Sequence, residues 1–128
     1  MTTGRRRVLV VDDEPDVRAV VRLSLEHVGG WDVVDVEGGL AAVRAAQERP
    51  PDAVVLDVMR AGMDGPATYR LLQSDARTAD IPVVMLTARV DRADRETWLA
   101  MGVRAVLAKP FDPVQLPGQL RDVLGWPR

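Results

Sequence analysis

The sequence of 128 residues predicts a single α/β domain, with an open, doubly wound sheet of five parallel strands and helices on both faces. Two observations carry this prediction. Short runs rich in β-branched residues alternate five times with helical patterns, and the runs are mostly continuous in hydrophobicity, which suits strands buried on both faces. Right-handed crossovers then place the helices on both sides of the sheet. Repeats, linkers and low-complexity segments do not interrupt the alternation.

The strands are expected where valine and other apolar residues gather in short runs bounded by turn residues. These runs are Arg7–Val11, Trp31–Val36, Ala53–Leu56, Pro82–Leu86 and Ala105–Ala108.

The first two helices are predicted from apolar spacing and from the residues that stop them. An apolar stripe runs from Val17 to Val28, with Pro15 in the first turn and Gly29-Gly30 as the stop. A shorter helix is expected over Leu40–Arg49, ended by Pro50-Pro51.

The last three helices are predicted from their capping residues. Asp64 is a candidate N-cap for the third, and the fourth is expected over Asp91–Met101, closed by Gly102. Asp112-Pro113 opens the fifth, but Pro117 lacks the N–H that would bond to the Pro113 carbonyl. We therefore expect a kink there, or a helix that effectively starts at Pro117.

Composition argues against several classes of protein. With 47% hydrophobic and 28% charged residues and a net charge of −2, a soluble globular domain is expected, and neither nucleic acid nor an anionic membrane is an expected obligate partner. The apolar run after Arg5-Arg6-Arg7 ends at Asp12, too early for a signal peptide, and no stretch is long enough to span a membrane. The absence of cysteine fits a reducing compartment, so a cytoplasmic protein is expected.

Polar residues follow four of the predicted strands. Asp12 and Asp13 follow the first, Asp57 the third, Thr87 the fourth, and Lys109, the only lysine in the chain, the fifth. Each residue alone has an ordinary explanation, such as capping a helix or forming a turn. Together they all fall at the carboxyl edge of the sheet, where this architecture binds ligands.

These residue types suit phosphoryl transfer with a metal ion. Carboxylates gathered in one place repel one another unless a cation joins them, and hard oxygen ligands favour Mg²⁺. Asp12, Asp13 and Asp57 therefore form a candidate magnesium site. A carboxylate can act as a nucleophile toward phosphorus, while Lys109 neutralises charge and Thr87 donates a hydrogen bond.

With these motifs in view, the chain resembles a response-regulator receiver domain of two-component signalling, similar to chemotaxis regulators. The resemblance runs from about Arg7 to Leu124 and implies a flavodoxin-like (βα)5 fold with strand order 2-1-3-4-5. The motifs that carry it are Val10-Val11-Asp12-Asp13-Glu14-Pro15, Val55-Leu56-Asp57-Val58-Met59, Gly62-Met63-Asp64-Gly65, Leu86-Thr87-Ala88 and Lys109-Pro110-Phe111.

The resemblance implies a role for each matching residue. Asp57 is the phosphoacceptor, and Lys109 pairs with it and then with its phosphate. Asp13 ligates Mg²⁺ directly, Asp12 ligates it mainly through water, and the Met59 backbone carbonyl is a further ligand.

Two further residues and the partners also follow from the resemblance. Thr87 moves toward the phosphoryl group as the switch, and Pro110 follows a cis peptide. The phosphoryl donor is a sensor histidine kinase or a histidine phosphotransfer protein, and the output is a protein target that the sequence does not name, with a homodimer possible. Such domains catalyse their own phosphorylation and dephosphorylation but are usually not classed as enzymes.

The chain departs from the family pattern at several positions. Val106 stands where the family has Tyr or Phe, so we expect that Trp98 fills the volume the smaller side chain leaves; the simpler alternative is a tryptophan packed on its own helix. Ala61 replaces a common proline, which predicts a looser loop. His27, the only histidine, is expected to be a partly exposed helix residue and not a phosphohistidine.

Three other functions compete with phosphorylation. A receiver-like binding module that works without phosphorylation usually lacks an acidic residue or the lysine, and this chain has both. A dehalogenase-type phosphatase needs a second acid two residues after the nucleophile, where Met59 stands. A flavodoxin-like cofactor binder needs a phosphate-cradling loop, whereas Asp12–Pro15 is acidic. The sequence ends just past the fifth helix, so residues 1–128 are expected to form one receiver domain. As a whole protein it would act through protein contacts, and as a piece of a longer protein its output would lie elsewhere.

Overall fold

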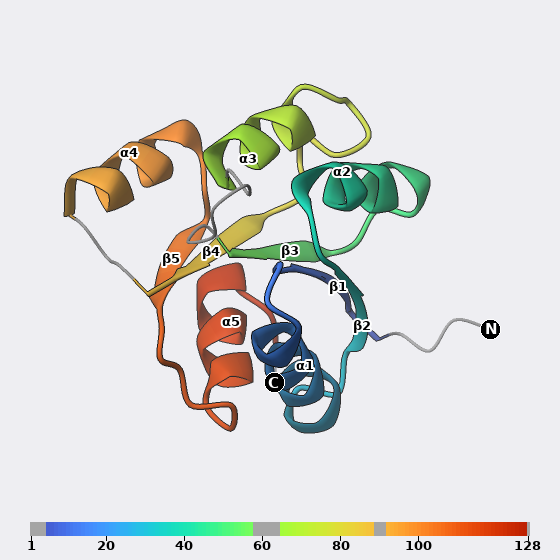
Figure 1. Ribbon diagram of the computed structural model, residues 1–128, viewed down its shortest axis with the longest axis vertical. Coiled ribbons are helices and arrows are strands. Elements are labelled where there is room, and N and C mark those ends of the chain that lie inside the picture. Colours follow the sequence, from blue (N-terminus) through green and yellow to red (C-terminus); the bar gives the residue numbers. More distant parts are fainter. Residues whose placement is uncertain (1–4, 58–64, 89–91, 128) are drawn as a thin grey trace.

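The computed structural model describes residues 5–57, 65–88 and 92–127. Strands and helices alternate along the chain (Figure 1). The strands are β1 (Arg7–Val11), β2 (Asp32–Val36), β3 (Ala53–Asp57), β4 (Val83–Thr87) and β5 (Ala105–Ala108). The helices are α1 (Pro15–Leu23), continued by a π-helical turn η1 (Ser24–Val28), α2 (Gly39–Glu48), α3 (Gly65–Gln73), α4 (Arg92–Met101) and α5 (Leu116–Leu124).

The strands form one parallel sheet in the order β2-β1-β3-β4-β5, which confirms the predicted fold class and strand order. Each predicted strand is present within one residue at either end. The central strands could be predicted because they are buried on both faces and are therefore mostly apolar: every residue of β3 and β4 is buried, whereas β2, at the edge of the sheet, is mostly half-buried.

Two hydrophobic layers cover the sheet. Helices α1 and α5 lie on one face, and α2, α3 and α4 lie on the other (Figure 1). The first layer contains Leu25, Leu116 and Leu120, and the second contains Leu56, Leu72 and Met85, all at most 1% exposed. Among the helices of the described residues, none is both long and apolar enough to cross a membrane.

The first helix changes its hydrogen-bond pattern where the sequence predicted a continuous α-helix up to Val28. From Ser24 the turn is π-helical, and the Gly29 N–H donates to the Ser24 carbonyl at 3.1 Å. Gly30, at φ +74°, then ends the segment as expected. The wider turn places Ser24 and Leu25 in the buried interior.

The fifth helix begins at Leu116 with Pro117 in its first turn, so the second of the two expected outcomes at this proline is the one found. Asp112 does not cap this helix; its carboxylate accepts the Val114 N–H at 2.8 Å in the turn before it. The Pro113 carbonyl, which cannot bond to Pro117, accepts a hydrogen bond from the buried Ser24 hydroxyl. The π-helical turn thus supplies the partner that the proline removes. Asp64 and Asp91, the expected starts of two other helices, lie outside the described residues.

Two glycines, Gly102 at the end of α4 and Gly118 in α5, give stability predictions of opposite sign. Gly102 has φ +114°, and a Cβ there would lie 2.6 Å from the Tyr69 hydroxyl. We expect Gly102→Ala to lower the free energy of unfolding by about 1–3 kcal/mol. Gly118→Ala in α5 meets nothing within 4 Å and should raise that free energy by up to about 1 kcal/mol. Urea denaturation of both variants checks this, and equal effects would contradict it.

Candidate functional site

The strand register brings two aspartates to the same level of the sheet. Val11 of β1 pairs with Leu56 of β3, so Asp12 and Asp57, each one residue further on, lie side by side at the carboxyl edge. Both residues are buried, each only 1% exposed. Thr87, also buried, ends the next strand, where Asp57 pairs with Leu86. Three of the predicted strand-end residues, Asp12, Asp57 and Thr87, therefore lie at this edge.

Lys109 enters this site from the end of β5. Its Nζ lies 2.6 Å from Asp57 Oδ2 and 3.7 Å from Asp12 Oδ2, and its own side chain is only 12% exposed. The Lys109 N–H donates to the Thr87 carbonyl at 2.8 Å, and the Lys109-Pro110 peptide is cis, as expected. The ammonium is a compact point charge, which lets it lie between two carboxylates.

The electrostatics of the site disfavour a negative charge on Asp12. Burial, together with the neighbouring Asp57 carboxylate, raises the pKa of Asp12 from its ordinary value of 3.8 to about 6. The Glu14 N–H, which donates to Asp12 Oδ1 at 2.9 Å, and the nearby Lys109 oppose the rise in this pKa. One lysine therefore does not balance the carboxylates, and the site favours a further cation.

The carboxylates that converge are not the same as those the sequence indicated. Among the described residues, Asp12, Glu14 and Asp57 each place an oxygen so that all three lie within 4.8 Å of one another, a donor set that fits a hard cation. Glu14 is an addition that the acidic run Asp12-Asp13-Glu14 could have indicated. Asp13 is half-buried, and its carboxylate is not part of this cluster found among the described residues. Met59 and Ala61 lie outside the described residues.

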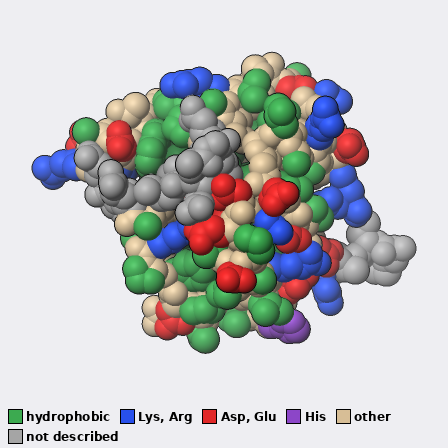
Figure 2. Space-filling model, viewed as in Figure 1, with side chains coloured by type: hydrophobic (Ala, Val, Ile, Leu, Met, Phe, Trp, Pro, Cys, Tyr) green, Lys and Arg blue, Asp and Glu red, His purple; other side chains and the backbone are tan. Residues whose placement is uncertain are grey.

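The surroundings of the site combine charge with apolar surface. Figure 2 shows acidic and basic side chains gathered near the centre of this face, bordered by hydrophobic ones. An apolar cavity of about 500 Å³ opens beside Lys109, between Val17 and Val20 of α1 and the segment Pro110-Phe111, with Asp16 and Ala88 completing its wall. A partner that reaches Lys109 along this side therefore meets an apolar surface.

The residues that depart from the family pattern lie in the second hydrophobic layer. Val106 is buried, and Trp98 of α4 is half-buried and packs against the cluster that contains Val106 and Tyr69. The Trp98 ring is thus not in solvent, and its role as a substitute for the missing aromatic side chain stays a prediction. His27 is exposed on η1, as expected.

Comparison with known proteins is consistent with this geometry. A model of the response regulator receiver domain matches residues 8–121. The phosphate regulon transcriptional regulatory protein PhoB of Klebsiella pneumoniae is 40% identical over 93% of this chain and 52% of its own length. The DNA-binding response regulator MtrA of Mycolicibacterium smegmatis is 37% identical over 94% of this chain and 51% of its own length. The chain thus spans about half the length of the curated relatives that it matches.

Solved structures resemble the whole described fold. The chemotaxis protein CheY4 of Vibrio cholerae superposes with a TM-score of 0.87 at 28% identity, covering 94% of this chain and 99% of that one. The receiver domain of a sensor histidine kinase from Pseudomonas aeruginosa, with a magnesium ion coordinated in its active-site cleft, gives 0.82 at 30% identity, covering 95% of this chain and 99% of that one. The chain therefore belongs to the response regulator receiver domain family of two-component signalling.

Proposed function

We propose that Asp57 accepts a phosphoryl group from a phosphohistidine on a sensor kinase or a phosphotransfer protein. The observation that carries the proposal is the buried Asp57 carboxylate held 2.6 Å from Lys109 Nζ at the edge of the sheet. A nucleophile and a cation at this distance are the parts that phosphoryl transfer needs from a protein.

The proposed transfer exchanges one bond to phosphorus for another. An Asp57 carboxylate oxygen attacks phosphorus, the bond from phosphorus to the histidine nitrogen breaks, and that nitrogen keeps the electron pair. Lys109 Nζ, already beside the carboxylate, offsets the charge on the phosphoryl oxygens. The domain's own residues thus promote the phosphorylation of the domain itself, and a domain that modifies only itself is usually not classed as an enzyme.

The proposed cofactor is Mg²⁺, held by Asp12 and Asp57 with Asp13 or Glu14. When bound, the ion supplies positive charge between the carboxylates and the phosphoryl oxygens. Two observations support it: the oxygens of Asp12, Glu14 and Asp57 lie within 4.8 Å of one another, and the pKa of Asp12 is raised to about 6. The magnesium-bound receiver domain of Pseudomonas aeruginosa agrees with this choice. Met59 stays a predicted backbone ligand.

The proposed output is a change of surface that a protein partner reads. Thr87 ends β4 beside Asp57, so its hydroxyl is placed to respond to a phosphoryl group. The kinase, the target and a homodimer are partners that we infer from the family. MtrA, a relative of about twice this length, is a DNA-binding response regulator, and our expectation of no direct nucleic-acid contact concerns residues 1–128 alone.

Phosphorylation by a small-molecule donor tests the proposal. We expect acetyl phosphate to label the native chain only with Mg²⁺, and Asp57→Asn not to be labelled at all. Asp94→Asn, a matched exchange at an exposed position in α4, should be labelled like the native chain. Mass spectrometry of the intact proteins measures the result. A folded native chain that binds Mg²⁺ but takes no label would contradict the proposal and favour a binding module that works without phosphorylation.

A further inference from the structure

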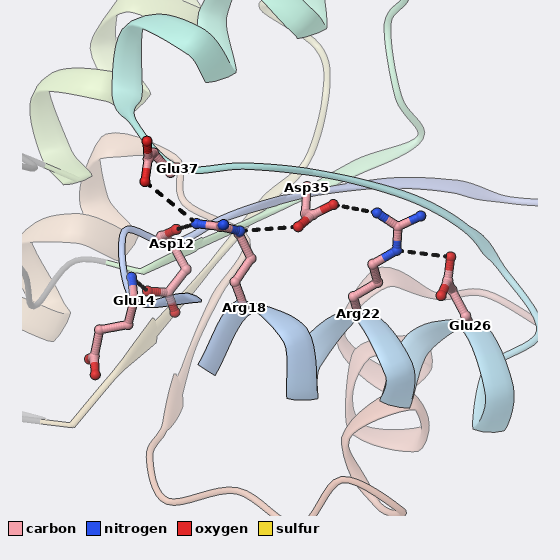
Figure 3. A network of polar contacts seen from close by, with 7 residues as sticks. All are labelled: Asp12, Glu14, Arg18, Arg22, Glu26, Asp35 and Glu37. Atoms are coloured by element: carbon pink, nitrogen blue, oxygen red, sulfur yellow. Dashed lines mark hydrogen bonds and ion pairs between the residues drawn. The ribbon is translucent and has the colours of Figure 1, made fainter. Parts of the chain in front are cut away.

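We propose that Arg18 is a positioning residue that fixes Asp12 for the metal site, an inference that rests on the proposed function. Arg18 belongs to the first turn of α1, and its guanidinium reaches across to the ends of β1 and β2 (Figure 3). Its side chain is only 20% exposed. The arginine thus connects α1 to β2 and to the acidic loop that follows β1.

Arg18 contacts the acidic site through the backbone of Asp12. Its Nη1 donates to the Asp12 carbonyl at 2.9 Å, while its Nε donates to Asp35 Oδ2 of β2 at 3.0 Å. A more distant ion pair, 4.0 Å long, joins Nη1 to the exposed Glu37. Arg18 thus links the residue that carries a site carboxylate to the neighbouring strand.

Asp12 is consequently held by all of its polar groups. Its N–H donates to the Val36 carbonyl at 3.1 Å, and its own carbonyl accepts from Arg18. Its carboxylate accepts the Glu14 N–H at 2.9 Å through Oδ1 and faces Lys109 through Oδ2. Because β1 ends at Val11, the Asp12 carbonyl lies beyond the strand. The arginine fixes the peptide group that follows the Asp12 Cα, and so fixes the direction in which the carboxylate projects.

The arginine is itself held in place. Asp35 is bracketed by two arginines, with Oδ2 accepting from Arg18 and Oδ1 from Arg22, and Arg22 also bonds to Glu26 at 3.2 Å (Figure 3). Asp35 balances the charge of Arg18 and holds its guanidinium in place. The guanidinium therefore acts on Asp12 mainly as a fixed hydrogen-bond donor to its carbonyl, and less through its positive charge. A rigid second layer of this kind is what keeps metal ligands in position.

Lysine cannot replace Arg18 in this role. The planar guanidinium presents separate N–H groups to Asp35 and to the Asp12 carbonyl, whereas an ammonium is a point charge on a flexible stem. We therefore expect Arg18→Lys to keep the ion pair with Asp35 and to lose much of the control over Asp12.

The test compares two arginines that share Asp35. Arg22→Gln removes the bonds to Asp35 and Glu26, whereas Arg18→Gln removes the bonds to Asp35 and to the Asp12 carbonyl. Calorimetric titration with Mg²⁺ should show about tenfold weaker binding for Arg18→Gln. We expect a loss of several-fold for Arg18→Lys and a change within about twofold for Arg22→Gln, as for a part-exposed ion pair.

A second readout needs no metal. The Glu14 N–H bonds to the Asp12 carboxylate, so its hydrogen exchange in metal-free protein reports how firmly Asp12 is held. We expect faster Glu14 exchange in Arg18→Gln and Arg18→Lys and native exchange in Arg22→Gln. Equal changes in the Arg18 and Arg22 variants, or none in either, would overturn the inference. If the native chain bound no Mg²⁺, the proposed function would fail, while Glu14 exchange would still decide the role of Arg18.

Discussion

Replacing Lys109 with glutamine is expected to slow the phosphorylation of Asp57 by about a hundredfold, as the loss of one preorganised charge-stabilising group does in enzymes. Lys109 Nζ lies 2.6 Å from Asp57 Oδ2 and 3.7 Å from Asp12 Oδ2, so it is placed to offset charge that builds up during the transfer. Glutamine keeps a donor but has no charge. The rate of label incorporation from acetyl phosphate at saturating Mg²⁺ measures the effect.

Lys109→Arg is the matched control, because it keeps the charge but changes its shape. The planar guanidinium cannot place a point charge between Asp12 and Asp57, so we expect an intermediate rate. If Lys109→Gln were phosphorylated as fast as the native chain, the contact with Asp57 would serve only to hold the fold together. Thermal denaturation of each variant separates a slow folded protein from an unfolded one.

Replacing Asp12 with asparagine is expected to stabilise the metal-free protein while weakening Mg²⁺ binding. Burial and the neighbouring Asp57 raise the pKa of Asp12 from 3.8 to about 6, so ionised Asp12 costs the folded state stability. A rise of about two pKa units corresponds to about 3 kcal/mol. Asparagine carries no charge to bury, but it also removes a carboxylate ligand, and Mg²⁺ affinity should fall at least about tenfold.

The pH dependence fixes the sign of this effect. At pH 4, Asp12 is protonated in the folded native chain and only partly ionised in the unfolded one, where its pKa has the ordinary value of 3.8, so Asp12→Asn should change stability much less than at pH 7. Between pH 4 and about 6, Asp12 loses its proton in the unfolded native chain before it does so in the folded one. The free energy of unfolding of the native chain therefore falls as the pH rises through this range. The stabilisation by asparagine should therefore appear over this range and remain constant above it. Urea denaturation at pH 4 and pH 7 tests this, and a variant less stable than the native chain at pH 7 would contradict it.

The strands could be predicted closely because their burial leaves a direct mark on the sequence. Arg7–Val11 and Ala105–Ala108 have the expected bounds, since both lie between turn residues and in a sheet covered on both faces. The helix ends were harder to predict. The apolar stripe through Val28 fits an α-helix and a π-helical turn equally well, and the choice depends on packing that brings Ser24 to the Pro113 carbonyl.

The candidate site was predictable to the extent that it depends on strand ends. Asp12, Asp57 and Lys109 lie together because the strand order brings β1, β3 and β5 to the same edge of the sheet, and the sequence marks those ends. Glu14 and Arg18 follow from how α1 packs against the strands. Their contacts depend on the direction of long side chains, which hydrophobic spacing does not reveal.

The position of the phosphoryl group tests the central claim most directly, because several carboxylates lie together in this site. After phosphorylation with acetyl phosphate and Mg²⁺, borohydride reduction marks the acyl phosphate, and peptide mass spectrometry locates the marked residue. The account predicts modification at Asp57 alone. Modification at Asp12, Asp13 or Glu14 with Asp57 unmodified would contradict it, since the acceptor would then not be the carboxylate paired with Lys109.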